Sequence, residues 1–165
     1  MRRVVAWVVD WLVIAAYAAL LLPIGLAVGA PSWDLAPTVW NVISFGLLIV
    51  PVTAWLAWWE RGAGAASPGK RVLRLVVRDP RSGSKPPRFG RALVRNALKV
   101  ALPWELGHTA TFVFASRTES TAAQTVGWVC AVLAYGLALA YVVSLFVGSG
   151  RTPYDRIAGT RVDRV

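Results

Sequence analysis

Near the start of the chain, the side chain that could most clearly take part in chemistry is Asp10, a carboxylate inside an otherwise apolar stretch. This stretch runs from Val4 to about Val28, and at about 1.5 Å per residue it is long enough to cross a bilayer. An ionised carboxylate there costs about 2.5 kcal/mol or more unless it reaches water or a partner. Arg3, Asp10 and Tyr17 recur every seven residues, so they share one helix face. We therefore predict a polar stripe that faces protein.

Two roles are open for Asp10. It lies only about 10 Å of helix inward from Arg3, within reach of a cation such as Lys99 or Arg95 from a later helix. Paired in this way, Asp10 would join helices together. Alternatively, it would bind and release a proton or cation on a transport path.

Further polar residues fall at membrane depth in the second half of the chain. Glu105 and His108 follow Lys99, and we expect all three to line the same interior as Asp10. Glu105 and His108 have a spacing that can share a metal, but a di-metal helical bundle needs a second such pair, which the sequence lacks. The segment 64–70 has the spacing of a phosphate-binding loop, but Arg71 stands where that loop needs serine or threonine. We predict no enzyme activity, no cofactor and no metal.

The charge distribution is strongly one-sided. The chain has 165 residues, of which 56% are apolar, and a formal charge of +10. Seventeen of its 18 lysines and arginines lie before the first apolar stretch, between Arg61 and Lys99, or after Gly150. Basic residues gather on the cytoplasmic side of membrane proteins. We therefore expect both termini in the cytoplasm and attribute the charge to topology, with no nucleic-acid partner.

The apolar segments predict an all-α integral membrane protein with one domain over residues 1–165. Four transmembrane helices are expected, with outer turns at 29–34 and 116–122. The third helix is kinked at Pro103, and an interfacial helix followed by a half-span is the alternative. The predicted spans are approximately 4–28, 38–58, 96–116 and 125–147.

The basic region after the second span has a different pattern. Residues from about 70 to 88 alternate β-branched and charged side chains around a turn at Asp79–Gly83, which predicts a small cytoplasmic β-hairpin. The tail 148–165 ends in an alternating segment that could add a third strand. Anionic lipid headgroups attract such cations at about 1 kcal/mol each, and the residues expected to meet them are Arg71, Arg74, Arg78, Arg88 and Arg91.

Three features together resemble the RDD family of bacterial membrane proteins. They are Arg3 seven residues before Asp10, the segment Ser67–Leu73, and the segment Tyr154–Thr160. By this resemblance, Arg3, Asp10 and Asp155 correspond to the arginine and two aspartates that name the family. Tyr154 and Ser67 stand where histidine and threonine are commoner. The resemblance implies a membrane protein for which transport has been proposed, some members being described as cation/proton antiporters.

Two functions follow as hypotheses. The first is transport or cation/proton exchange in the bacterial inner membrane, by an oligomer, because four helices leave little room for a substrate path. The second is an accessory, scaffold or assembly role, in which the basic cytoplasmic face docks a partner protein or anionic lipid. In either case Arg3 and Asp155 lie at the same membrane surface, where an arginine–carboxylate contact would tie the tail to the first helix.

Overall fold

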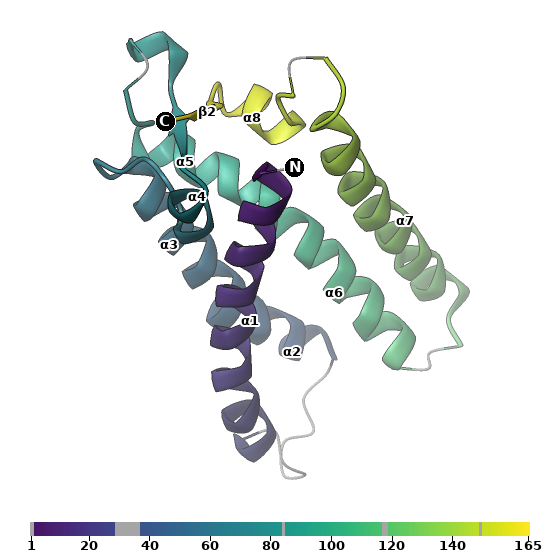
Figure 1. The fold of residues 1–165 in the computed structure, drawn as a ribbon. Helices are drawn as coiled ribbons and strands as arrows, with labels where there is room; N and C mark the ends of the chain where they lie inside the picture. The colour runs from purple at the N-terminus through teal and green to yellow at the C-terminus, as the bar shows by residue number, and fades with distance from the viewer. Residues whose placement is uncertain (1, 29–36, 84, 117–118, 149) are drawn as a thin grey trace.

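The computed structural model describes residues 2–28, 37–83, 85–116, 119–148 and 150–165. The chain is mostly helical, and both termini lie at the same end of the molecule, which we call the terminal end (Figure 1). The predicted turn at 29–34 lies outside the described residues. The helical elements are α1 (Arg2–Val28), α2 (Pro37–Ser44), η1 (Phe45–Ile49), α3 (Val50–Arg61), α4 (Pro68–Val72), η2 (Pro80–Ser82), α5 (Phe89–Asn96), η3 (Ala97–Ala101), α6 (Leu102–Ala115), α7 (Thr121–Ser144) and α8 (Pro153–Ile157).

Among the described residues, three helices are long and apolar enough to cross a membrane. They are Arg2–Pro23, Thr38–Arg61 and Thr121–Ser144. The last begins four residues before the predicted start, because Ser120 accepts a hydrogen bond from the Ala123 N–H and so caps the helix earlier. α5, η3 and α6 form a further continuous helix, and α6 packs along α7 (Figure 1).

Two of the long helices contain a π-turn that ends two positions before a proline. η1 precedes Pro51, and η3 precedes Pro103. Proline has no N–H, so it leaves a carbonyl in the preceding turn without a donor. A tyrosine from a neighbouring helix supplies that donor in each case: the Tyr17 hydroxyl donates to the Leu47 carbonyl at 2.8 Å, and Tyr141 donates to Leu98 at 2.6 Å. Where the sequence predicts a kink at Pro103, the structure has the π-turn η3.

The small sheet differs from the predicted hairpin. β1 (Leu75–Arg78) pairs antiparallel with β2 (Arg161–Arg164) from the tail. Within the described part of 70–88, residues beyond β1 contribute only an isolated bridge between Asp79 and Lys85. The predicted turn at Asp79–Gly83 is present as the 3₁₀ turn η2, but the described residues after it form no second strand beyond that bridge, and the strand paired with β1 is β2.

Two short helices at the terminal end, α4 and α8, were not predicted. Each begins with a hydroxyl residue followed by proline, Ser67-Pro68 and Thr152-Pro153, and proline suits the first helical position because its φ is already helical. Neither hydroxyl caps its own helix. The Ser67 hydroxyl instead donates to Asp10 of α1, and the Thr152 hydroxyl donates to Asp155 within α8, so both hydroxyls bind buried carboxylates.

The apolar core lies between α1, α3 and η3. Its buried members are Ile14, Val52, Leu56 and Val100, and Trp55 packs against them. Most other large apolar side chains of α1 and α7 are exposed, as expected for surfaces that face lipid. The core fixes the inner face of α1, which is the face that carries Asp10.

Candidate functional site

Asp10 is buried, with 2% of its surface exposed. The Ser67 hydroxyl donates to its Oδ2 at 2.7 Å, and the Gly69 N–H donates to its Oδ1 at 2.9 Å. The start of α4 therefore binds the carboxylate of α1. A Cβ at Gly69 would overlap the Ala6 carbonyl oxygen of α1, so glycine is needed for this close approach.

Two ammonium groups flank the same carboxylate. Lys70 Nζ lies 3.8 Å from Asp10 Oδ2, and Lys99 Nζ lies 3.9 Å from it. Lys70 also donates to Glu60 at 2.8 Å and to Ser67 at 3.0 Å. Burial lowers the pKa of Lys70, although Glu60 opposes this change. Lys99 makes no hydrogen bond to any described residue through its ammonium group.

Glu60, at the end of α3, is the second carboxylate and is fully buried. Arg95 Nη1 donates to Glu60 Oε1 at 2.6 Å, and Asn96 Nδ2 donates to Oε2 at 2.9 Å. With Lys70, these contacts give Glu60 two charged donors and one amide donor. Glu60 follows the predicted second span, 38–58, and no spacing in the sequence distinguishes it from a solvated residue at a helix end.

Asp155, in α8, is the third buried carboxylate. Arg3 Nη2 donates to its Oδ2 at 2.8 Å, and Arg95 Nε donates to its Oδ1 at 2.7 Å. The hydroxyls of Thr152 and Thr160 also donate to it, at 2.8 and 3.2 Å. Burial disfavours the charged carboxylate, but Arg95 and the other donors outweigh that effect and hold the pKa of Asp155 below its usual value.

Arg95 connects the contacts around Glu60 with the contacts around Asp155. Its guanidinium bridges Glu60 and Asp155 while only 1% of the residue is exposed. Burial opposes its charge, and the contacts with two carboxylates compensate for that cost. We call the seven linked charged residues the charge network: Arg3, Asp10, Glu60, Lys70, Arg95, Lys99 and Asp155.

The charge network joins five separate parts of the chain at the terminal end. Removing one partner of a buried ion pair typically costs about 3–5 kcal/mol, because the other charge stays buried without compensation. Loss of one charged residue should therefore destabilise the packing of several segments at once. These segments are the ends of α1 and α3, the α4 turn, the α5–η3 helix and the tail.

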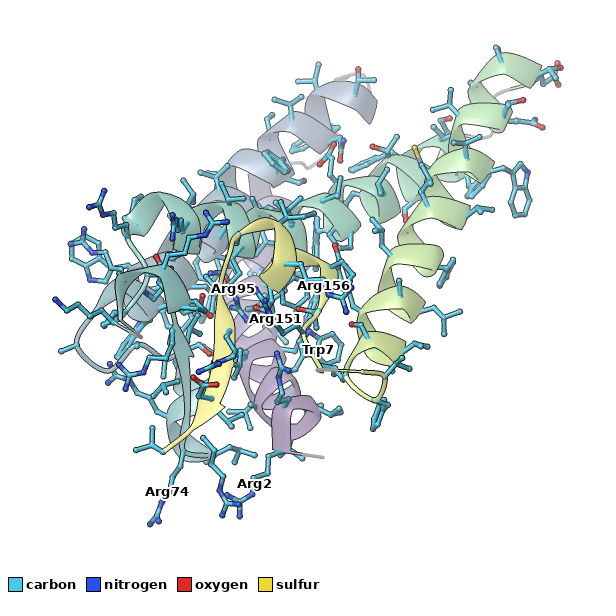
Figure 2. All side chains as sticks on the ribbon, turned by 90° about the horizontal axis from the view of Figure 1, so that it is seen from above. Arg2, Trp7, Arg74, Arg95, Arg151 and Arg156 are labelled. Atoms are coloured by element: carbon cyan, nitrogen blue, oxygen red, sulfur yellow. The ribbon has the colours of Figure 1, made fainter. Side chains whose placement is uncertain are left out.

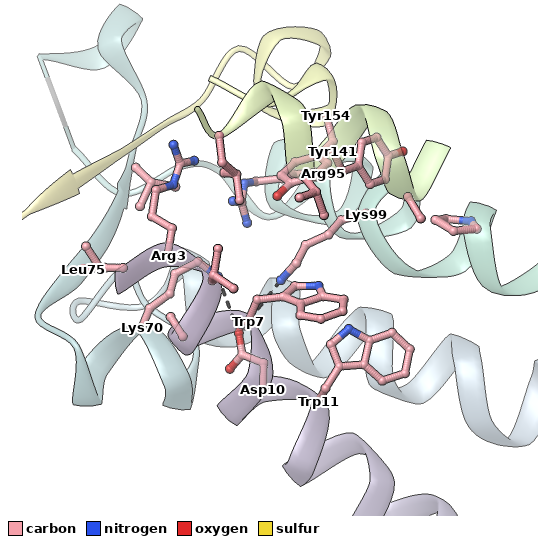
Figure 3. A pocket seen from close by; sticks show the side chains of 17 residues that line it. Arg3, Trp7, Asp10, Trp11, Lys70, Leu75, Arg95, Lys99, Tyr141 and Tyr154 are labelled. Carbon is pink, nitrogen blue, oxygen red and sulfur yellow. Dashed lines mark ion pairs between the residues drawn. The ribbon is translucent and has the colours of Figure 1, made fainter. Parts of the chain in front are cut away.

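A cavity of about 350 Å³ opens beside the charge network. Its charged lining residues include Asp10 and Lys99, and aromatic side chains of α1, α7 and α8 form much of the remainder (Figure 3). The aromatic lining residues are Trp7, Trp11, Tyr141 and Tyr154. Asp10 and Lys99 of the charge network therefore border this cavity.

Three of the residues expected in the polar interior lie outside the charge network. Glu105 accepts a hydrogen bond from Asn41 Nδ2 at 2.6 Å. His108 lies between the rings of Trp104 and Phe112, at 4.8 and 5.8 Å. Tyr17 binds the carbonyl of Leu47, as described above. Arg95 and Lys99 therefore meet Asp10 or its partners, whereas Glu105, His108 and Tyr17 make separate contacts.

The predicted headgroup residues occupy mixed positions. Arg74 and Arg88 are exposed, and Figure 2 shows Arg74 and Arg2 projecting from the molecule while Arg95 lies inside it. Arg71 lies over the Trp59 ring, 4.1 Å from its centroid. Arg91 pairs with Asp79, and Arg78 is half-buried in β1. Some of these cations therefore have intramolecular partners.

Comparison with known proteins identifies the family of the chain. A family model described as RDD family matches residues 1–159. The chain belongs to the RDD family. No match was found among curated proteins or among solved structures. The chain is thus a membrane protein of this family. Arg3, Asp10 and Asp155, the residues that resemble the family's naming residues, all lie in the charge network.

Several residues that belong to the charge network, or that donate hydrogen bonds to it, were not identified from the sequence. Ser67 and Lys70 lie in the segment that carries the family resemblance, so their position could have suggested a role beside Asp10. Thr152 and Thr160 flank Asp155 in the second such segment. Glu60 and Asn96 had no such signal, because their roles depend on how α3 packs against α5.

Proposed function

We propose that this RDD protein crosses the bacterial inner membrane four times, with both termini in the cytoplasm. The helix formed by α5, η3 and α6 would be the third crossing. Support comes from the grouping of 17 of 18 basic residues into three segments, which an even number of crossings would bring to one side, together with both termini at one end of the molecule (Figure 1). An even number of crossings fits both observations.

Within this topology, we propose proton- or cation-coupled transport or exchange as the function. One observation carries the proposal: the contact between Asp10 and Lys99, at 3.9 Å, lies against the cavity and lacks a direct hydrogen bond. Glu60 and Asp155 are instead bound to arginine at 2.6–2.8 Å. A proton or cation that neutralised Asp10 would weaken its attraction for Lys99 without dissolving the rest of the charge network.

The protein would act as an oligomer. The cavity has a volume of only about 350 Å³, and α7 contributes few buried residues to the single chain. A continuous path across the membrane would need surfaces from a second copy, and the exposed apolar faces of α1 and α7 are available for this contact.

Gradient-driven flux in proteoliposomes tests this function. We expect wild-type protein to move protons or sodium in response to a pH or sodium gradient. The double variant Asp10→Asn with Lys99→Met removes both charges, so it should fold but give no flux. Arg88→Met, at an exposed position, is the matched control and should retain flux. Absence of flux from wild-type liposomes, or full flux from the double variant, would refute the proposal.

An accessory role is the second candidate, and the outward-facing cations favour it. Arg74 and Arg88 are exposed, and their side chains form no hydrogen bond or ion pair with the described part of the chain. Such residues are available for a partner protein or anionic headgroups. Purification in mild detergent, followed by identification of co-purifying proteins, tests this role. Loss of a specific partner from a combined Arg74→Ala and Arg88→Ala variant would support it.

A further inference from the structure

The charge network contains one more positive than negative charge. Its cations are Arg3, Lys70, Arg95 and Lys99, and its carboxylates are Asp10, Glu60 and Asp155. A buried excess charge is costly unless a counter-ion compensates it. One additional anion would therefore balance the charge of the network.

The excess charge is located at Lys99. Arg3, Lys70 and Arg95 each donate to a carboxylate at 2.8 Å or less. Lys99 reaches Asp10 only at 3.9 Å, and Asp10 already accepts hydrogen bonds from Ser67 and Gly69. Among the described residues, Lys99 is therefore the cation in the network with the weakest compensation.

Lys99 also faces the cavity, whose remaining walls are largely apolar. Trp7 and Trp11 of α1 contribute to these walls, as do Ala138 and Val142 of α7 and Leu145 directly after it. Figure 3 shows the Lys99 side chain directed between Asp10 and the Trp7 ring. A hydrophilic anion would leave these walls without an apolar partner, and a neutral lipid would leave the charge uncompensated.

We propose that the cavity binds an anionic membrane amphiphile, with its acidic head at Lys99 and its acyl chain between α1 and α7. The volume of about 350 Å³ is at the lower end of ligand sites. It would hold the head and the first part of a chain, and the rest would extend along the exposed apolar side chains of α7. This inference does not depend on the proposed exchange function.

Native mass spectrometry of the detergent-purified protein tests the proposal. The probes are phosphatidylglycerol, phosphatidylcholine with the same chains, oleate and inorganic phosphate. We expect retention of phosphatidylglycerol or oleate, but not of phosphatidylcholine or phosphate. Lys99→Met should weaken binding about tenfold, as expected for loss of one charge-assisted contact, whereas Arg88→Met should bind as the wild type does.

A second variant fills the cavity without altering the charge network. Ala138 lines the cavity from α7, and its side chain is exposed, so Ala138→Trp should fold and yet exclude the acyl chain. We expect it to lose the amphiphile while keeping the wild-type melting temperature. Equal retention of phosphatidylcholine, retention of phosphate alone, or unchanged binding in Lys99→Met and Ala138→Trp would each overturn the proposal.

Discussion

Replacement of Arg95 by methionine should destabilise the protein more than any substitution of an exposed arginine. The guanidinium makes contacts of 2.6 Å to Glu60 and 2.7 Å to Asp155 while buried. Loss of one partner of a buried pair costs about 3–5 kcal/mol. Glu60 keeps Lys70 and Asp155 keeps Arg3, so we expect about 3 kcal/mol for Arg95→Met, at the lower end of that range.

The assay is equilibrium unfolding in mixed micelles of mild and denaturing detergent, followed by circular dichroism. Arg88→Met is the control, because Arg88 is exposed, and it should unfold as the wild type does. Arg95→Lys should recover only part of the loss, since a single ammonium cannot reproduce the planar fork that spans two carboxylates. Stability of Arg95→Met within about 0.5 kcal/mol of the wild type, the usual range for surface substitutions, would refute this reasoning.

Three further predictions concern topology, packing and pH. In a background without native cysteine, a cysteine at Ser120 should be labelled only from outside and one at Ser82 only from inside; labelling of both from one side would contradict four crossings. Gly69→Ala should lower stability by about 1–3 kcal/mol, the usual cost of overpacking, because a Cβ there overlaps the α1 backbone, and an unchanged melting temperature would contradict this contact. Since the folded-state pKa of Asp155 lies below its ordinary 3.8, its contribution is present above that pH and lost as pH falls through the folded-state value. Asp155→Asn should therefore be less stable than the wild type at pH 7, with a gap that closes only in strong acid; a gap already absent at pH 5 would contradict the shift.

Features set by local composition could be predicted from the sequence. The apolar stretches around Asp10 and before Ser144 give long helices, and the clustered cations place both termini at one end. The contact of Arg3 with Asp155 could also be anticipated, because both residues belong to segments expected at the same membrane surface.

Features set by long-range packing could not be predicted. Glu60 looks like a solvated residue after a span, and it becomes the partner of Arg95 only because α3 packs against α5. The strand at Leu75–Arg78 was expected to pair locally, yet its partner comes from the tail. The alternation in the tail did indicate a strand at its end, but which strand it pairs with depends on long-range packing, as does the contact of Glu60 with Arg95.

The reactivity of the three lysines tests the central claim most directly. We claim that, among the described residues, Lys99 forms an ion pair only with Asp10, whereas Lys70 also forms one with Glu60, and Lys85 is exposed. The measurement is the rate at which a membrane-permeant amine reagent modifies each lysine, determined by mass spectrometry. In the wild type, Lys85 should react quickly and the other two slowly. In Asp10→Asn, Lys99 should become reactive while Lys70 stays slow; equal acceleration of both buried lysines, or of neither, would contradict the account.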